Sequence, residues 1–244
     1  MILVLGGTAE ARELATLLDT AGTRFMSSLA GRVARPRLPV GAVHMGGFGG
    51  VSGLRSFLLE NRVSAVVDAT HPFAQGMTAN AVAACAADGV PLLRLERPGW
   101  SDAPGADTWE WVEDHDAAAA AAARLGRHPF ITVGRQSLDH FVGPLGDLPT
   151  LVRAVDEPAI DLPTAWTLVL SRGPYLLDDE RALFDEHDVD VVVTKDSGGS
   201  FTWPKLQVAA ERGAAVVVVR RGPGPAGVDV VSDPQAAAVW AAGR

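Results

Sequence analysis

The first segment whose residue types could do chemistry is LGGTAEAR, in which the turn over residues 6–10 directly follows an apolar run over residues 1–5. Placed on the dinucleotide-binding fingerprint G-x-G-x-x-G, the chain has Gly6, Thr8 and Ala11 at the three key positions. Thr8 stands where a glycine normally lets the backbone approach a diphosphate, so the match is degenerate. The position still favours an anion, because backbone N–H groups at the start of a helix point at it. The segment predicts a nucleotide phosphate site, with a plain Gly-Gly turn as the alternative.

The end of the second apolar run, SSLAGR over residues 27–32, carries information about the nucleotide. A domain that binds NAD places an Asp or Glu here, which accepts a hydrogen bond from the free ribose 2′-hydroxyl. This segment has no acidic residue, and the guanidinium of Arg32 can form a forked hydrogen bond to a 2′-phosphate. We therefore expect NADP in preference to NAD. The alternative is that Arg32 belongs to a solvated cluster with Arg35 and Arg37.

Two further segments of the first half precede predicted helices. Five of the eight residues over 46–53 are glycines, which permits close approach of a ligand and is also typical of a mobile loop. DATHPF, over residues 68–73, follows a predicted strand, and ligands bind at the carboxyl ends of strands in open α/β sheets. His71 could donate a hydrogen bond to a substrate or a nicotinamide there, or it could only cap or pack. Pro72 suits the first turn of the next helix.

In the second half, TVGRQS over residues 132–137 and SRGPY over residues 171–175 share one design: a strand end, a small residue, an arginine, and then a turn or helix. Each arginine could face a ligand carboxylate or could lie on the surface. The strongest pattern is TKDSGGSFTWPKL over residues 194–206, which contains both lysines of the chain, Lys195 and Lys205. Backbone N–H groups of a glycine-rich loop together with ammonium groups suit an anionic ligand. A structural loop is the alternative.

The elements that must position these segments are strands, predicted from short apolar runs, which alternate with helices, predicted from apolar residues at helical spacing. The predicted strands cover residues 1–5, 24–29, 63–69, 91–95, 109–112, 130–133, 151–155, 168–170, 189–194 and 215–219. The predicted helices cover residues 10–18, 56–61, 72–87, 114–125, 137–142, 178–187, 204–212 and 234–242. The strands lack apolar and polar alternation, which indicates burial on both faces, as in a parallel sheet.

This alternation predicts an α/β fold with two Rossmann-like open parallel-sheet domains that face a cleft. The Pro-, Gly- and Asp-rich segment over residues 96–107 is the expected boundary. We assign residues 1–100 to an NADP-binding domain and residues 106–244 to a substrate-binding domain. The last helix is free to pack on either domain.

Composition and charge exclude several classes of protein. The 244 residues are 48% apolar and 20% charged, which is ordinary for a globular protein and unlike a disordered one. The net charge of −8 argues against a general nucleic-acid binder. Residues 1–104 hold 9 basic and 8 acidic side chains, and residues 105–244 hold 12 and 21, so an anionic ligand needs local positive charge.

Other patterns are missing from the sequence. The apolar runs are shorter than the roughly 20 residues that span a bilayer, and no signal peptide is evident. The single cysteine, Cys85, cannot form an internal disulfide, so we expect a cytoplasmic protein. The six histidines are scattered and CxxC pairs are absent, so no metal site is expected. A G-x-S-x-G nucleophile elbow is also absent. The chemistry should therefore belong largely to a bound cofactor.

Taken in order, the motifs LGGTAEAR, SLAGR, DATHPFA, ERPGW, TVGRQSL, SRGPY and TKDSGGSFTWPKL resemble the precorrin-6A reductase family over residues 5 to about 221. The resemblance implies reduction of one double bond of the precorrin-6A macrocycle by NADPH, giving precorrin-6B in cobalamin biosynthesis, with neither flavin nor metal. Ala11 departs from the pattern LGGTxEGR. The implied partner is a polycarboxylate tetrapyrrole; neither nucleic acid nor membrane is implied, and a monomer is compatible.

Direct hydride transfer is the implied mechanism, and three groups of residues are expected to serve it. The catalytic candidates, for proton delivery, are Lys195, Asp196 and His71. The cofactor candidates are Gly6, Gly7, Thr8, Ala9, Glu10, Ser28, Ala30, Gly31, Arg32, Gly47, Thr70 and His71. The substrate candidates are Arg97, Gly134, Arg135, Arg172, Lys195, Ser197, Gly198, Thr202 and Lys205.

Two other functions fit parts of the pattern. An NADP-sensing two-domain binding protein without turnover would share the fold, but it would not require the loop that carries Lys195 and Lys205. A tetrapyrrole methyltransferase could use the first glycine-rich turn for S-adenosylmethionine. Arg32 argues against it, because an acidic residue normally holds an unphosphorylated ribose.

Overall fold

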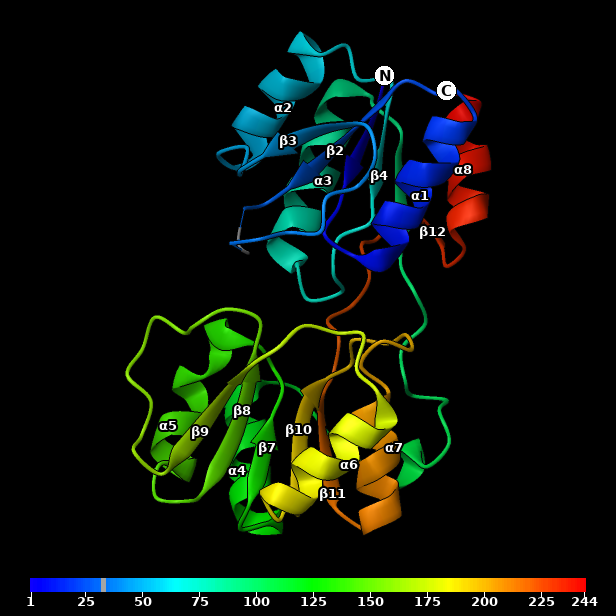
Figure 1. Ribbon diagram of the computed structural model, residues 1–244. Helices are drawn as coiled ribbons and strands as arrows, with labels where there is room; N and C mark the ends of the chain where they lie inside the picture. Colours follow the sequence, from blue (N-terminus) through cyan, green and yellow to red (C-terminus); the bar gives the residue numbers. More distant parts are fainter. Residues whose placement is uncertain (32–33) are drawn as a thin grey trace. The chain divides into compact units, whose positions relative to one another are not determined.

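The computed structural model describes residues 1–31 and 34–244, which divide into two units (Figure 1). Unit 1 contains Met1–Pro98 together with Gly222–Arg244, and unit 2 contains Gly99–Arg221. The chain therefore passes twice between the units. The first crossing lies inside the Pro- and Gly-rich segment, whereas the second places residues 222–244 in unit 1 and not in the domain to which we assigned residues 106–244.

Unit 1 is a six-stranded sheet covered on both faces. Its strands are β1 (Ile2–Leu5), β2 (Phe25–Leu29), β3 (Ala42–Met45), β4 (Ala65–Asp68), β5 (Leu92–Leu95) and β12 (Asp229–Val231), in the order β12-β5-β4-β1-β2-β3. Its helices are α1 (Ala9–Thr20), α2 (Gly50–Glu60), α3 (Gln75–Asp88) and α8 (Pro234–Ala242). Ile2 and Val4 pack with residues of α1 and α8, and Leu3 and Leu5 with residues of α2 and α3, because successive strand residues face opposite sides.

Unit 2 repeats this design. Its strands are β6 (Glu110–Val112), β7 (Pro129–Ile131), β8 (Thr150–Ala154), β9 (Trp166–Leu170), β10 (Val191–Lys195) and β11 (Ala215–Val219), in the order β6-β11-β10-β7-β8-β9. Its helices are α4 (His115–Leu125), α5 (Asp139–Leu145), α6 (Leu177–Glu186) and α7 (Pro204–Arg212), with 3-10 turns η1 (Ala106–Thr108) and η2 (Arg135–Ser137).

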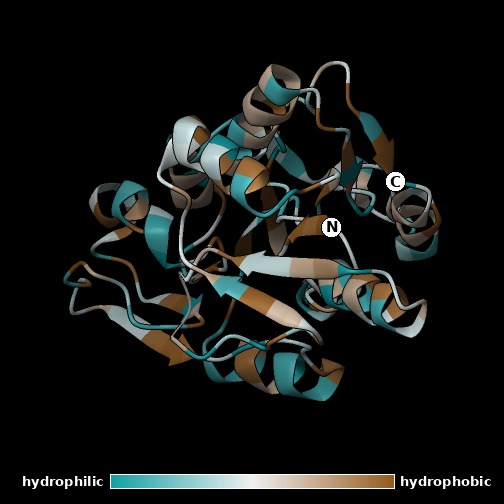
Figure 2. Cartoon of the chain, turned by 90° about the horizontal axis from the view of Figure 1, so that it is seen from above, coloured by the Kyte–Doolittle hydropathy of each residue, from teal (hydrophilic) through white to brown (hydrophobic). Residues whose placement is uncertain are grey.

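All the strand pairs are parallel in both sheets, which confirms the predicted α/β class with two Rossmann-like parallel sheets. In Figure 2 the helices carry both brown and teal residues, as expected for helices with one face on a sheet and one in solvent. None of the helices in the described ranges is long and apolar enough to cross a membrane.

The sixth strand of the unit 1 sheet comes from an unexpected part of the chain, whereas β6 of unit 2 lies in the domain to which we assigned it. After β5 of unit 1, the next strand along the chain, β6, joins unit 2 beside β11. After β11 of unit 2, the next strand, β12, completes unit 1 beside β5. We did not predict β12 or β3. Both are short edge strands with partly or fully exposed residues, so they lack the continuous apolar run of the inner strands.

A buried ion pair connects the inner strands of unit 1. Asp68 at the end of β4 is 0% exposed and Arg94 in β5 is 2% exposed, with Nη1 of Arg94 2.9 Å from Oδ2 of Asp68. Asp68 also accepts hydrogen bonds from the backbone and side chain of Thr70 and from the side chain of Thr78. Nε and Nη2 of Arg94 both donate to Glu96. The network satisfies both buried charges, which is the condition under which such a pair is tolerated.

Arg94→Met should lower the free energy of unfolding by about 3–5 kcal/mol, because it leaves the buried Asp68 carboxylate without its cation. Arg55→Met, which removes the exposed ion pair between Arg55 and Asp88, should leave the urea midpoint nearly unchanged. Urea denaturation of the two variants measures the difference. Equally small changes in the urea midpoint of both variants would show that the buried pair stabilises the fold no more than the exposed pair.

Unit 2 also buries charged side chains, among them Arg153, Glu180 and Lys205. Arg153 of β8 pairs with Glu180 of α6, and both are almost fully buried. Arg153 also lies over the ring of Tyr175, 3.7 Å from its centroid. Lys205 of α7 is 2% exposed, and its Nζ donates to the carbonyl of Thr202 at 2.8 Å. Burial, and then the nearby Arg153 charge, lowers the pKa of Lys205 to about 7.

Lys205→Met should change the pH dependence of stability. Above about pH 7 the folded chain holds Lys205 neutral while the unfolded chain still protonates it, so unfolding takes up a proton and stability rises with pH up to the unfolded pKa. The free energy of unfolding of the variant relative to the parent should therefore fall by about 1 kcal/mol per pH unit between about pH 7.5 and 9.5. Urea denaturation at several pH values tests this. A difference independent of pH would mean that Lys205 is charged in the folded protein.

Candidate functional site

The carboxyl edge of the unit 1 sheet brings together the segments that we predicted to bind a nucleotide. β1 lies between β2 and β4, and the chain proceeds from β1 toward β3 on one side and from β4 toward β5 on the other. The loops that follow β1 and β4 therefore diverge at this point, which is where ligands bind in open α/β sheets. The turn after β1 contains Gly6, Gly7 and Thr8, and the segment after β4 contains Thr70 and His71.

Thr8 explains the degenerate fingerprint. Its Oγ1 caps α1 by accepting from the N–H of Ala11 at 3.1 Å, and it donates to the carbonyl of Ala69 at 2.8 Å. One hydroxyl therefore ties the turn after β1 to the segment after β4. Gly7 has φ +115°, and the space that a Cβ would occupy there is open. A diphosphate can approach this backbone and the N-terminus of α1, so the turn fits a dinucleotide.

The first turn of α1 also holds charge. Oε2 of Glu10 lies 2.8 Å from Nη1 of Arg97, which follows β5 by two residues. The pair offsets a carboxylate that would otherwise disfavour an anion beside the turn. Ala9, the first residue of α1, lies between Thr8 and Glu10. The predicted substrate residue Arg97 is thus placed in unit 1, next to the predicted cofactor turn.

The end of β2 meets the second glycine-rich loop. Ser28 is buried in β2, and the N–H of Gly46 donates to the carbonyl of Leu29 at 2.8 Å. This bond places the loop that contains Gly47 beside the end of β2, where Ala30 and Gly31 follow. Arg32, our candidate for the 2′-phosphate, lies outside the described residues. The helix after the loop begins at Gly50, six residues before the start of the predicted helix over residues 56–61.

Thr70 and His71 are held by local bonds. Thr70 bonds to Asp68 through its backbone and hydroxyl, and its Oγ1 also accepts from Arg94. Nδ1 of His71 accepts from the N–H of Phe73 at 3.2 Å, so a neutral ring carries its hydrogen on Nε2. We predicted that Pro72 lies in the first turn of the next helix. The helix begins only at Gln75, so Pro72 lies in the turn before it.

The carboxyl edge of the unit 2 sheet gathers the predicted substrate residues in the same way. Gly134 and Arg135 follow β7, and Lys195, Asp196, Ser197 and Gly198 lie at or after the end of β10, its neighbour. A Cβ on Gly134 would lie 3.9 Å from Nζ of Lys195, so the two loops are in contact. Arg135 donates to the carbonyl of Glu157 and lies 3.8 Å from Asp156.

Arg172 follows β9, the edge strand of unit 2, and its loop is connected to the loop after β10. The N–H of Tyr175 donates to the carbonyl of Phe201 at 3.2 Å. Thr202, the next residue, offers its carbonyl to Lys205. Lys205 is buried beneath this loop and does not reach a ligand on the surface. Its structural role is to hold the loop, which corrects our assignment of Lys205 to substrate binding.

Lys195 and Asp196 differ in their surroundings. Burial lowers the pKa of Lys195 to about 8. Oδ1 of Asp196 accepts from the N–H of Trp100 at 2.9 Å, and Oδ2 lies 3.2 Å from Nε of Arg221. Asp196 thus holds the first and last residues of unit 2 against the end of β10. These contacts match the alternative that Asp196 forms an ion pair, and a part for it in proton delivery stays a prediction.

His115 is a residue that our sequence interpretation missed. It begins α4, directly after β6, and so lies at the carboxyl edge of unit 2. Its Nε2 is buried without a hydrogen-bond partner among the described residues. Burial lowers the pKa of His115, as do the nearby charges of Lys195 and His140, against the opposing effect of Asp114 and Asp116. A lone histidine carries no sequence signal, but its place at the start of a helix after a strand could have indicated it.

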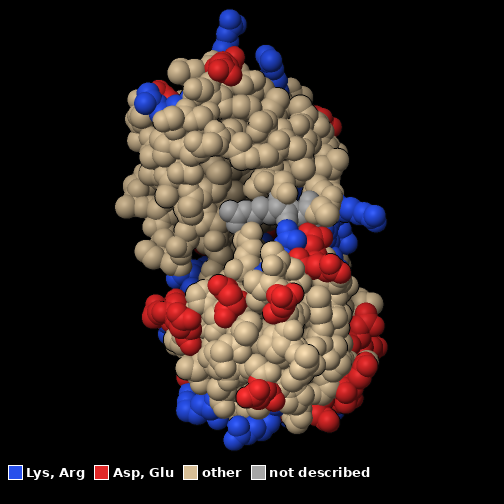
Figure 3. Space-filling model, turned by 90° about the vertical axis from the view of Figure 1, so that its left-hand side faces the viewer, with Lys and Arg blue, Asp and Glu red and all other residues tan. Residues whose placement is uncertain are grey.

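The two units differ in net charge. Unit 1 holds 10 basic and 9 acidic residues, whereas unit 2 holds 11 basic and 20 acidic residues. Figure 3 shows red acidic side chains gathered on unit 2. Lys195, Arg135 and Arg172 are therefore local positive charges on an acidic body. Across residues 1–31 and 34–244, no group of three or more His, Cys, Asp or Glu side chains is arranged to hold a metal ion.

Comparison with known proteins agrees with the pattern of motifs. The model of the family described as "Precorrin-6x reductase CbiJ/CobK" matches residues 1–242. The precorrin-6A reductase of Rhodococcus erythropolis is 48% identical over 240 residues, covering 98% of this chain and 96% of that protein. The precorrin-6A reductase of Mycobacterium tuberculosis is 47% identical over 243 residues, covering 99% and 97%.

A solved structure named "CobK precorrin-6A reductase" has a TM-score of 0.91 and 38% identity, covering 99% of this chain and 96% of that one. Its fold therefore matches the fold described above throughout. The match of the family model to nearly every residue, together with these identities over whole chains, shows that this chain belongs to the precorrin-6x reductase family.

Proposed function

We propose that the chain reduces precorrin-6A to precorrin-6B with NADPH, by hydride transfer to one carbon of a macrocycle double bond and addition of a proton to its neighbour. The observation that carries the proposal is the junction of the β1 and β4 loops in unit 1, where Thr8 bonds to Ala69 beside an open Gly7 turn. Membership of the family and the names of the closely related proteins support the substrate and the reaction.

Unit 1 has the features that a bound NADPH requires. The N-terminus of α1 and the Gly6–Gly7 turn would hold the diphosphate through backbone N–H groups. The described residues at the end of β2, from Ser27 to Gly31, include no carboxylate that would accept from a free ribose 2′-hydroxyl. NADPH, when bound, supplies the hydride equivalent. The protein residues bind and orient it, and the network of Asp68 and Arg94 keeps Thr70 in place at the same edge.

Unit 2 has the features that a polycarboxylate ligand requires. The macrocycle carries acetate and propionate groups, and cations in a partly desolvated site attract them strongly. Lys195, Arg135 and Arg172 lie at the ends of three strands of one sheet, and Ser197, Gly198 and Thr202 supply hydroxyls and backbone donors between them. These residues orient the ligand on a unit whose overall charge is negative.

Lys195 is the residue that we propose as the proton donor. Its pKa of about 8 leaves it mostly protonated at neutral pH while making the proton easier to give up than in solution. Asp196 is occupied by Trp100 and Arg221. His71 carries a hydrogen on Nε2 when neutral and lies in unit 1, where we assign it to positioning.

The purified chain should consume NADPH only when precorrin-6A is present, and the product should gain two hydrogens in mass. Loss of reduced-nicotinamide absorbance and mass spectrometry measure this, with NADH and a sample without tetrapyrrole as controls. Tight NADPH binding with no turnover of precorrin-6A would contradict the proposal and favour an NADP-sensing protein.

Lys195→Arg should separate charge from proton transfer. Arginine keeps the positive charge at every working pH but cannot give up a proton, so KM for precorrin-6A should stay within a few-fold while kcat falls by about 100-fold or more. In the parent enzyme kcat should fall as pH rises through about 8, because Lys195 then loses its proton. An arginine variant with normal kcat would reduce Lys195 to an electrostatic role.

A further inference from the structure

Tyr175 is the single tyrosine of the chain, and it closes the turn that follows β9. Its hydroxyl donates to the carbonyl of Ser171 at 3.3 Å, so the turn that contains Arg172 is closed on itself. Ser171 is fixed in turn, because its N–H donates to the carbonyl of Ala154 at the end of β8. A Cβ on Gly173 would lie 3.2 Å from Cε2 of Tyr175, so the turn fits tightly around the ring. The path of the backbone around Arg172 therefore depends on the Tyr175 side chain.

The same residue connects this turn to the loop after β10. The N–H of Tyr175 donates to the carbonyl of Phe201 at 3.2 Å, and Phe201 directly precedes Thr202 in that loop. β9 and β10 are not neighbours, because β7 and β8 lie between them in the sheet. With about 4.8 Å from one strand to the next, the two strands end about 14 Å apart. Figure 1 shows the chain after β9 crossing this edge of the sheet to α6, and the bond from Tyr175 to Phe201 joins the two loops across that span.

A buried ion pair supports the ring of Tyr175 from inside unit 2. The guanidinium carbon of Arg153 lies 3.7 Å from the centroid of this ring. Arg153 belongs to the inner strand β8, is 6% exposed, and pairs with Glu180 of α6, which is 1% exposed. It also lies 4.8 Å from the centroid of the Phe130 ring in β7. The contact between cation and ring is strong where water is excluded, so the ion pair in the core holds the ring in place.

We infer that Tyr175 is a positioning residue for the tetrapyrrole, which sets the separation between Arg172 and the donors of the loop after β10. The inference rests on the proposed function and adds the residue that arranges the substrate groups. A macrocycle carries its carboxylates around a wide rim, so its binding requires donors from distant strands at fixed separations. Tyr175 maintains such a separation through its contacts with Ser171, Phe201 and Arg153. A ligand with one carboxylate does not need this bridge, so the bridge favours a polycarboxylate ring.

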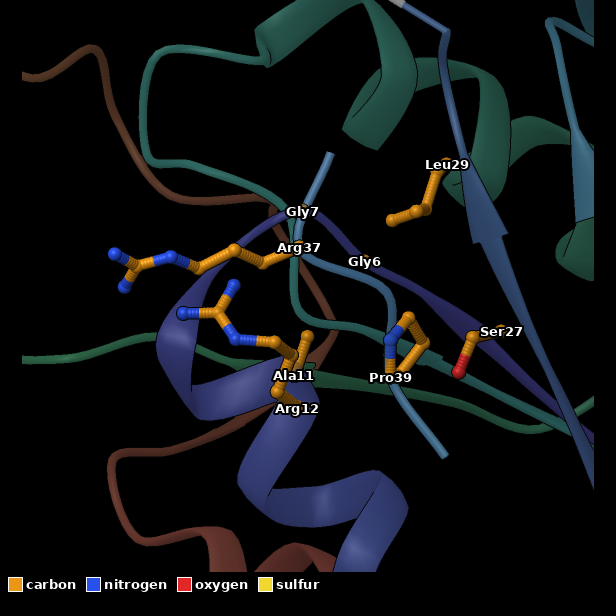
Figure 4. A pocket seen from close by; sticks show the side chains of 8 residues that line it. All are labelled: Gly6, Gly7, Ala11, Arg12, Ser27, Leu29, Arg37 and Pro39. Carbon is orange, nitrogen blue, oxygen red and sulfur yellow. The ribbon is translucent and has the colours of Figure 1, made fainter. Parts of the chain in front are cut away.

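Steady-state kinetics of two variants of the full chain test the inference. Tyr175→Phe removes only the hydroxyl bond to Ser171, whereas Tyr175→Leu also removes the ring from Arg153. KM for precorrin-6A should rise by about 3- to 10-fold in the first variant and by about 30-fold or more in the second, with kcat within about three-fold of the parent. KM for NADPH should stay within about two-fold, because NADPH is proposed to bind in unit 1, where Gly6 and Ala11 line the pocket beside the diphosphate turn (Figure 4).

A double-mutant cycle with Arg172→Gln measures whether Tyr175 acts through Arg172. Adding Arg172→Gln to Tyr175→Leu should raise KM for precorrin-6A by no more than about three-fold beyond the larger of the two single effects, because both changes remove the same contact with the ligand. Single effects that multiply in the double variant would mean that the two residues act independently, and would overturn the inference.

Phe184→Leu is the matched control for lost stability. Phe184 is 2% exposed, packs edge-on against the ring of Phe130 in the core of unit 2, and belongs to α6 and to neither loop. The variant should lower the unfolding temperature and leave KM for precorrin-6A within about two-fold of the parent. A rise in KM as large as that of Tyr175→Leu would show that general loosening of unit 2 is sufficient, and would overturn the positioning role.

The inference and the proposed function fail in different ways. A parent chain that does not reduce precorrin-6A overturns the proposed function. A parent chain that reduces it, together with an unchanged KM for precorrin-6A in Tyr175→Leu, overturns the inference alone. If circular dichroism shows that Tyr175→Leu does not fold, Tyr175→Phe decides: a raised KM that Arg172→Gln does not multiply supports the inference, and an unchanged KM overturns it.

Discussion

The buried ion pair between Asp68 and Arg94 is the interaction on which the proposed cofactor edge depends. A charge in the core of a sheet is costly to bury, and this pair is tolerated because hydroxyls, a backbone N–H and Glu96 complete its hydrogen bonding. These hydrogen bonds fix the path of the backbone after β4. This path places the carbonyl of Ala69 where Thr8 donates to it, so the turn after β1 is held by a bond to a segment fixed by the core.

The connection continues around the edge of the sheet. Arg94 bonds to Glu96, and the next residue, Arg97, pairs with Glu10 in the first turn of α1. The turn after β1 is therefore held from the β4 side through Thr8 and from the β5 side through Glu10. A preorganised backbone of this kind is what binding a diphosphate through N–H groups requires, because no ordering has to accompany binding.

Unit 2 uses buried charge for a different purpose. The pair of Arg153 with Glu180, and Lys205 beneath Thr202, hold the loops after β9 and β10 from inside the unit. Asp196 holds both ends of unit 2 at the end of β10. Lys195 lies at the end of β10, next to Asp196. Burial lowers its pKa to about 8, close to neutral pH, as the proposed proton donor requires.

The sequence predicted the parallel sheets and most inner strands. Continuous apolar runs are typical of strands buried between two layers of helices, and here they alternate with segments whose apolar residues have helical spacing. It did not predict that β12 returns to the unit 1 sheet, since the local pattern says nothing about which sheet an edge strand joins. Lys205 was misassigned because lysines are rarely buried, and only the helix packing of α7 turns it inward. The role of Arg94 inside an apolar strand becomes clear only when the strand pairs with β4 and Arg94 meets Asp68.

A crystal structure of the full chain with bound NADP⁺ tests the central claim most directly. The account predicts that the diphosphate lies against the backbone of Gly7 to Ala9, with the sheet edge otherwise unchanged. A dinucleotide bound at the carboxyl edge of unit 2, beside Lys195, would contradict the assignment of the two units.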